Sequence, residues 1–351
     1  MKAPAKVEGG VLPRIVACAF IAGVLTGGAM AFALHSHATA VSEASAADPE
    51  LATIKATFRR PATVPFPASN PFTEAKRALG ERLFRDKRLS IDGSMACASC
   101  HIRSKGFADG RKHGRGVPDR PLKRHTPTLW NLAWASPVFW DGRARSLEEQ
   151  VAGPIEAPDE MGQPVASLTA LLATDPAYSR LFAAAFPKDP TVSADNLAKA
   201  IATFERTLVS PPTRFDRWIE GDAKALTPDE VAGFRLFTGK ARCSNCHTGW
   251  AFTDYAFHDI GLPGEDRGRG AVLRLEAADH AFKTPSLREI GRSAPYMHDG
   301  SLASLAQVIR HYESGIVERA SLSADLPRDL ELADRARAQL LAFLSTLTSE
   351  N

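Results

Sequence analysis

Four cysteines and two histidines form the clearest chemical pattern in this sequence, because they fall into two identical Cys-x-x-Cys-His segments. They are Cys97, Cys100 and His101 in the first segment and Cys243, Cys246 and His247 in the second. Such a segment is typical of c-type haem attachment, in which two thiols bond to the haem and the histidine ligates its iron. A single copy would also fit a zinc site or a redox pair. The fifth cysteine, Cys18, lies in an N-terminal apolar run, so two copies with no cysteine left for a disulfide favour two haems.

The sequence around each segment is repeated. Gly-Glu-Arg-Leu-Phe at 80–84 precedes the first segment, and Gly-Phe-Arg-Leu-Phe at 233–237 precedes the second. Thr-Pro-Thr-Leu at 126–129 and Thr-Pro-Ser-Leu at 284–287 follow them, each with an Asp-Gly pair at the same distance downstream. This self-similarity predicts two tandem copies of one haem-binding unit.

The two copies differ at a position that can bear on the iron. When the copies are superposed on their shared pairs, Tyr312 of the second aligns with Pro154 of the first. A tyrosine oxygen ligates iron and a proline cannot. We therefore expect the iron at His247 to be capped on both sides and the iron at His101 to keep a position for a small molecule. Alternatively, Tyr312 is a core residue, because it shares a helical face with apolar residues.

Polar side chains near Pro154 suit peroxide chemistry. The stretch 146–161 carries Gln150 and Glu160. Cleavage of peroxide needs a group that takes a proton from one oxygen and returns it to the departing one, and a carboxylate does both. Glu160 is the candidate, with an ordinary surface acid as the alternative. Trp140, one residue before the first Asp-Gly pair, is a candidate electron bridge between the haems, although large indoles are more often core residues.

Helices are expected to position these residues. The segment 227–230, Thr-Pro-Asp-Glu, is a capping box with proline in the first turn, and it predicts a helix that Gly239 ends. Ser193 is expected to cap another helix, whose apolar stripe stops at Pro211.

The composition agrees with a folded protein of about two domains. The chain has 351 residues, of which 44% are hydrophobic, and a formal net charge of +3 with acids and bases interleaved, which excludes a nucleic-acid footprint. We expect an all-α protein with domains at 48–210 and 211–351. The basic segment 103–124 lacks periodicity and is predicted to be a solvated loop.

Residues 1–47 have the layout of a secretory signal. Basic residues precede an apolar run from Ile15 to Leu34, and small residues follow it. The run is also long enough to span a bilayer, so a retained anchor is the alternative to a cleaved signal. Either way, the folded part is expected in the periplasm, and contact with a membrane only if the segment is retained.

Taken together, these motifs resemble the di-haem cytochrome c peroxidase and MauG family, from about Phe72 to Leu347. Besides the paired Cys-x-x-Cys-His segments, the likeness rests on Phe-Trp-Asp-Gly-Arg at 139–143, Gln150 with Gly-Pro at 153–154, Glu-Met-Gly at 160–162 and Ala-Pro-Tyr-Met-His-Asp-Gly at 294–300.

The resemblance implies two tandem cytochrome c-like domains, each with one covalently attached haem c. It implies that hydrogen peroxide reacts at the N-terminal haem, with Glu160 and Gln150 on the distal side. It also implies that Trp140 lies between the haems, and that a small donor protein, a cytochrome c or a cupredoxin, reduces the C-terminal haem.

Four residues concern the branch of the family that this chain resembles, its calcium site and its distal ligand. A methionine usually caps the C-terminal haem in the peroxidase branch, whereas Tyr312 resembles the MauG branch, whose members oxidise residues of partner proteins. Ala241 stands where the methylamine dehydrogenase maturase carries a tryptophan that passes oxidising equivalents, which disfavours that particular role. His125 replaces an asparagine calcium ligand, so an interdomain calcium is left open, as is the identity of His113 with the switchable distal histidine of peroxidases.

We therefore predict a periplasmic di-haem peroxidase that reduces hydrogen peroxide with electrons from a small redox protein. The second hypothesis is a MauG-like enzyme that takes these electrons from residues of a partner protein. The third is a passive di-haem electron carrier with both irons capped.

Overall fold

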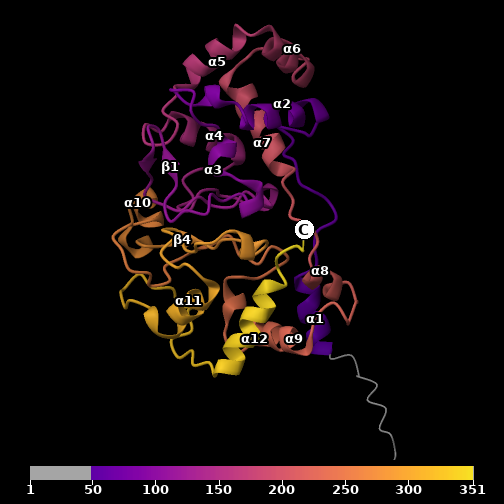
Figure 1. Ribbon diagram of the computed structural model, residues 1–351, viewed down its shortest axis with the longest axis vertical. Coiled ribbons are helices and arrows are strands. Elements are labelled where there is room, and N and C mark those ends of the chain that lie inside the picture. The colour runs from indigo at the N-terminus through magenta and orange to yellow at the C-terminus, as the bar shows by residue number, and fades with distance from the viewer. Residues whose placement is uncertain (1–48, 351) are drawn as a thin grey trace, which may run out of the picture. The chain divides into compact units, whose positions relative to one another are not determined.

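Helices make up most of the regular structure of residues 49–350, which the computed structural model describes; the predicted signal segment lies outside this range. The α-helices are α1 Pro49–Thr57, α2 Glu74–Phe84, α3 Cys97–Cys100, α4 Leu147–Glu156, α5 Val165–Ala173, α6 Pro176–Ala185, α7 Ala194–Arg206, α8 Arg214–Ile219, α9 Pro228–Thr238, α10 Arg269–Leu273, α11 Leu305–Arg310 and α12 Asp334–Ser345 (Figure 1). A π-helix, His311–Gly315, continues α11. Short 3₁₀ turns occupy Lys87–Leu89, Arg103–Lys105, Leu132–Trp134, Cys243–Asn245, Glu276–Ala278 and Ile290–Arg292. The prediction of a helix-rich fold is confirmed.

Strands in the described residues are short. β1 Arg115–Gly116 pairs antiparallel with β2 Arg120–Pro121, and β3 Phe257–His258 pairs antiparallel with β4 Phe282–Lys283. The first pair forms a small hairpin within the basic segment 103–124, much of which is exposed as predicted. Within residues 49–350, no helix combines the length and the apolar character that a membrane span requires.

Both helices predicted from caps are present. Thr227 and Glu230 form the capping box that begins α9, and Gly239 follows its last residue. Ser193 caps α7, whose first free amides include that of Asn196. This helix ends at Arg206, earlier than Pro211 alone would require.

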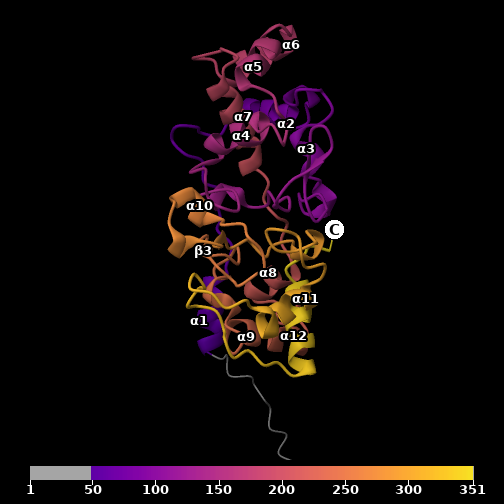
Figure 2. The ribbon, with the colours of Figure 1, turned by 90° about the vertical axis from the view of Figure 1, so that its left-hand side faces the viewer.

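Each copy of the repeat is built on a pair of crossed helices that meet at a glycine. A Cβ atom on Gly80 of α2 would lie 2.0 Å from the Ala200 carbonyl oxygen of α7. A Cβ atom on Gly233 of α9 would lie 2.0 Å from the Gln339 carbonyl oxygen of α12. Glycine therefore permits the same close approach in both copies. The pair α2 and α7 and the pair α9 and α12 can be followed in both ribbon views (Figures 1 and 2).

The turns that follow the two Cys-x-x-Cys-His segments are also equivalent. The Thr128 hydroxyl donates to the Gly106 carbonyl at 2.7 Å, and the Ser286 hydroxyl donates to the Ala251 carbonyl at 2.6 Å. The repeat found in the sequence is thus a repeat of local structure.

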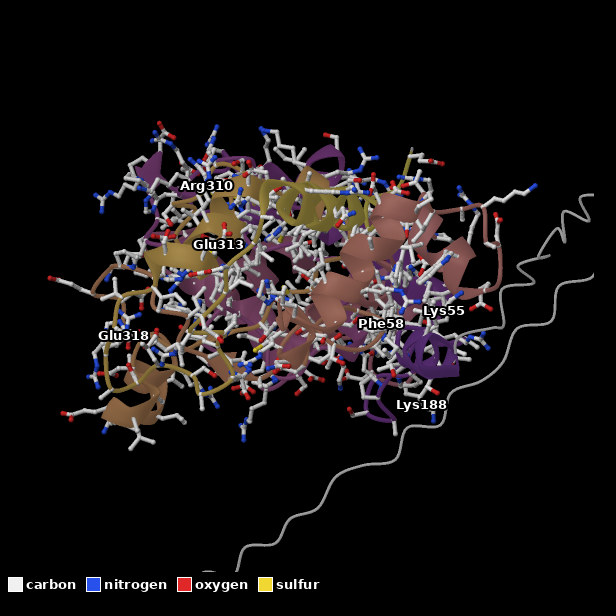
Figure 3. All side chains as sticks on the ribbon, turned by 90° about the horizontal axis from the view of Figure 1, so that it is seen from below. Lys55, Phe58, Lys188, Arg310, Glu313 and Glu318 are labelled. Carbon is white, nitrogen blue, oxygen red and sulfur yellow. The ribbon has the colours of Figure 1, made fainter. Side chains whose placement is uncertain are left out.

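Two large hydrophobic clusters form the core. The first contains residues of α2 and α4 to α7, and the second contains residues of α8, α9, α11 and α12. The helix α1 and Phe58 pack against the second cluster, although they precede the whole first copy in sequence. Figure 3 shows Phe58 and Lys55 close to the helices of this cluster. The division into domains at residues 210 and 211 stays a prediction.

Candidate active site

Each Cys-x-x-Cys-His segment lines its own cavity. The first cavity, of about 940 Å³, is lined by Cys97, Cys100 and His101. The second, of about 190 Å³, is lined by Cys243, Cys246 and His247. All four thiols are free. The structure therefore brings each predicted attachment set together beside an internal space.

The two histidines are held in the same way. The Nδ1 atom of His101 lies 2.8 Å from the Phe107 carbonyl oxygen, and that of His247 lies 3.0 Å from the Phe252 carbonyl oxygen. A carbonyl oxygen can only accept a hydrogen bond, so each Nδ1 carries the hydrogen and Nε2 is left to ligate a metal. Burial lowers the pKa of both imidazoles, which favours the neutral form that ligates.

The four thiols are available for thioether formation. Burial raises the pKa of Cys97, Cys243 and Cys246 to about 12 and that of Cys100 to about 11. Each segment offers two reduced thiols beside a histidine, which is what thioether formation and iron ligation require. Cys246, Asp254 and His258 lie within metal-binding reach of one another, but Nε2 of His258 is hydrogen-bonded to Asp254 at 2.7 Å. The donor set and the cavity therefore fit a covalently attached haem.

The first cavity also contains the predicted peroxide-handling residues. Gln150 and Pro154 on α4 and Glu160 beyond it all line this cavity. The Glu160 carbonyl accepts from the Val117 amide at 2.7 Å, and Gly116 permits the hairpin to approach, since a Cβ there would lie 1.9 Å from the Asp159 carbonyl oxygen. Burial raises the pKa of Glu160, an effect that is opposed by the nearby cation of Arg143.

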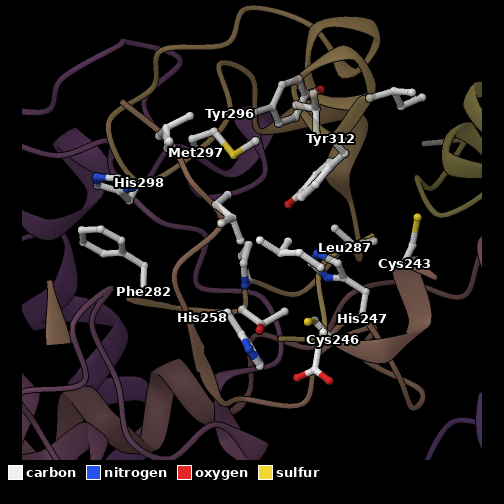
Figure 4. Close-up of a pocket in the computed structure, with 18 of the residues that line it drawn as sticks. Cys243, Cys246, His247, His258, Phe282, Leu287, Tyr296, Met297, His298 and Tyr312 are labelled. Carbon is white, nitrogen blue, oxygen red and sulfur yellow. The ribbon is translucent and has the colours of Figure 1, made fainter. Parts of the chain in front are cut away.

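Tyr312 lines the second cavity with His247. Figure 4 shows its hydroxyl pointing into the space that His247 also faces. The π-helix His311–Gly315 sets this orientation, because it replaces the regular continuation of α11. Such single π-turns are frequent at functional sites. Burial raises the pKa of Tyr312, and the Cys243 and Cys246 thiols add to this effect.

Trp140 lies in the wall between the cavities, because it lines both. Its Nε1 donates to the His125 carbonyl at 2.9 Å, and its own carbonyl accepts from the Lys283 amide at 2.8 Å. Lys283 and Met297 line both cavities as well. Neither residue was predicted from the sequence to lie between the cavities. The alignment of Met297 with Phe139, next to Trp140, could have indicated its position.

Three further residues, which the resemblance makes relevant to ligand binding or electron transfer, are His113, His125 and Ala241. His113 is not among the residues that line the first cavity, and its buried Nδ1 has no hydrogen-bond partner. The Nδ1 of His125 donates to the Arg111 carbonyl at 2.8 Å. Calcium takes oxygen ligands, so this imidazole does not fit the calcium site that the resemblance suggested. Ala241 is buried and lines the second cavity, where it offers no indole.

Comparisons with known proteins agree with this arrangement. The family model described as di-haem cytochrome c peroxidase matches residues 74–224. The chain is 48% identical to the methylamine utilization protein MauG of Methylorubrum extorquens, over 97% of this chain and 96% of that protein. It is 36% identical to the cytochrome c551 peroxidase of Nitrosomonas europaea, over 82% of this chain and 84% of that protein.

A solved structure is similar as well. The crystal structure of a MauG-like protein associated with microbial copper homeostasis superposes with a TM-score of 0.76 and 33% identity, covering 83% of this chain and 95% of that chain. Because relatives of both names match at least 82% of this chain at 36% identity or more, the chain belongs to the di-haem cytochrome c peroxidase family of haem enzymes.

Proposed function

We propose that the chain is an exported di-haem enzyme that reduces hydrogen peroxide in the first cavity with electrons that arrive through the second. One haem c is attached through Cys97, Cys100 and His101, and the other through Cys243, Cys246 and His247, in two tandem cytochrome c-like domains. The observation that carries the proposal is the difference between the cavities. Glu160 and Gln150 share the first cavity with His101, and Tyr312 shares the second with His247.

In the first cavity, a bound haem supplies a ferric iron that binds peroxide and accepts electrons. Glu160 in its ionised form takes a proton from one peroxide oxygen and returns it to the oxygen that leaves as water. Gln150 donates and accepts hydrogen bonds without changing charge, so it orients peroxide beside Glu160. Pro154 offers no side-chain ligand, so His101 would hold the haem in this cavity and its iron would stay able to bind substrate.

In the second cavity, Tyr312 and His247 would both hold the bound haem. Two protein ligands exclude peroxide, so this site passes electrons without reacting. Trp140 lies in the wall between the cavities and is the route for these electrons. The donor is a small protein such as a cytochrome c or a cupredoxin.

A second candidate differs in the source of electrons. Tyr312 favours a MauG-like enzyme that takes them from residues of a partner protein, and so does the greater identity to the relative named MauG. Ala241 disfavours a tryptophan relay next to the second segment. A passive electron carrier, with both irons capped, is the third candidate.

The test is stopped-flow absorption of the full chain, loaded with two haems and mixed with peroxide. It is run on the oxidised and the half-reduced protein, each with and without a reduced small cytochrome c. Rapid oxidation of the cytochrome supports the peroxidase. A spectral change that persists without oxidation of the cytochrome supports the MauG-like enzyme. No spectral change in either redox state overturns both and leaves the electron carrier.

A further inference from the structure

A buried carboxyl group in the first cavity takes no part in the chemistry proposed above. Glu205 on α7 is only 5% exposed and lines the same cavity as His101. Its Oε2 atom is buried and has no hydrogen-bond partner. An unpaired carboxyl at such a site is costly, and groups of this kind are concentrated at functional sites.

The charges around Glu205 do not neutralise it. Arg206, the next residue on α7, makes two hydrogen bonds to Glu148 of α4, at 2.6 and 2.8 Å. Lys76 of α2 donates to Asn70 and to the Pro71 carbonyl instead. Cys97 of α3 is close enough for the Glu205 charge to raise its pKa. Arg206 and Lys76 therefore make their hydrogen bonds to groups other than Glu205.

The repeat shows that this carboxyl is specific to the first copy. Gly80 meets Phe204 in α7 in the way that Gly233 meets Phe343 in α12, so Glu205 corresponds to Leu344. Leu344 lines the second cavity and is 8% exposed. One fold therefore places leucine beside the second attachment segment and an ionisable group beside the first.

We propose that Glu205 takes up a proton when the iron held by His101 is reduced and releases it when that iron is oxidised. The inference rests on the proposed haem at this segment. Ferric iron carries one more positive charge than ferrous iron, so oxidation favours the nearby carboxylate and reduction favours the neutral acid. The electron comes from the donor protein and the proton from water. Burial raises the pKa of Glu205 to about 8, with Arg206 opposing the effect and Glu148 adding to it, and this direction favours the neutral acid.

The coupling has a measurable signature. Between the pKa values of Glu205 in the two redox states, each unit of pH changes the redox equilibrium of the first haem tenfold, or about 59 mV for one electron. The test is spectroelectrochemical titration of both haems in the full, haem-loaded chain across neutral pH. We compare the wild type with Glu205→Gln and with Asp195→Asn, which removes an exposed carboxylate from the same helix.

The wild type and Asp195→Asn should show this pH dependence at the first haem, and Glu205→Gln should lose it while the second haem stays unchanged. A slope in Glu205→Gln equal to that of the wild type would overturn the proposal. If Glu205→Gln loads haem poorly, the test is the infrared difference spectrum between the reduced and the oxidised wild type. Reduction should produce the carbonyl band of a protonated carboxyl group, and no such band would refute the coupling. Haem content and peroxide consumption are measured on the same samples, so a failure of the proposed function is seen separately.

Discussion

At the scale of single residues, the proposed role of Glu160 makes the peroxide reaction dependent on pH. Its carboxyl group lines the first cavity, and burial raises its pKa above the ordinary value for glutamate. Only the ionised form accepts a proton. The reaction should therefore be fast above the pKa of Glu160 and slow as the pH falls through it, and this acid limb should lie at a higher pH than for a solvated glutamate.

The substitution Glu160→Gln should lower the rate of the peroxide reaction by about 10²- to 10⁴-fold, which is the usual contribution of a positioned proton acceptor. It should also remove the acid limb, while haem content stays the same. The measurement is the pH dependence of the initial stopped-flow phase. Glu156→Gln, which changes an exposed carboxylate on α4, is the control and should keep both rate and profile. An unchanged rate in Glu160→Gln would exclude the role of Glu160.

At the scale of elements, the crossed pairs α2 with α7 and α9 with α12 hold the two attachment segments. Both crossings depend on a glycine whose place a methyl group cannot take without moving a backbone carbonyl. Helix propensity alone would favour alanine over glycine by about 1 kcal/mol. The stabilisation gained from the close packing of the two helices must therefore exceed this loss of helix propensity.

Gly80→Ala should destabilise the protein by about 1–3 kcal/mol, because overpacking at the crossing exceeds the gain in helix propensity. Thermal unfolding followed by circular dichroism checks this. Ala78→Gly on the exposed side of α2 is the matched control, with an expected loss of about 1 kcal/mol from propensity alone. A gain of stability in Gly80→Ala would show that the two helices separate easily.

Local signals in the sequence were enough to predict some elements and not others. The start and end of α9 follow from Thr227, Glu230 and Gly239, whose contacts lie within the helix. The early end of α7 depends on a distant residue, since the Asn131 amide binds the Leu208 carbonyl.

The site follows the same rule. Cys-x-x-Cys-His segments are local. The repeat assigned Glu160 and Gln150 to the first segment and Tyr312 to the second, and these residues line the corresponding cavities. No local sequence pattern predicts the π-turn that orients Tyr312 or the burial of Glu205. Both arise from tertiary packing.

At the scale of the whole molecule, the proposed function requires electrons to cross the wall between the cavities. Trp140 is held in that wall from both sides, through His125 and through Lys283. The π-system of this indole is larger than that of a phenyl ring, so we expect it to carry electrons across the wall more readily.

Trp140→Phe should leave the absorption spectra of both haems intact and slow the transfer of electrons between them by roughly tenfold, or about 1.4 kcal/mol in barrier height. Half-reduced protein mixed with peroxide reports this rate through reoxidation of the second haem. Trp130→Phe, in an indole that lines the first cavity but not the second, is the control. An equal rate in both variants would assign the electrons another route.

The packing of Phe58 against Phe215, Phe234 and Phe252 has a consequence for the order of folding. Phe343, near the other end of the chain, completes the same aromatic group. The first copy of the repeat can collapse on contacts between its own neighbours. The aromatic group must instead bring together residues that lie far apart in the sequence, which is slow. A segment that leaves the ribosome among the first residues is thus among the last to reach its final place.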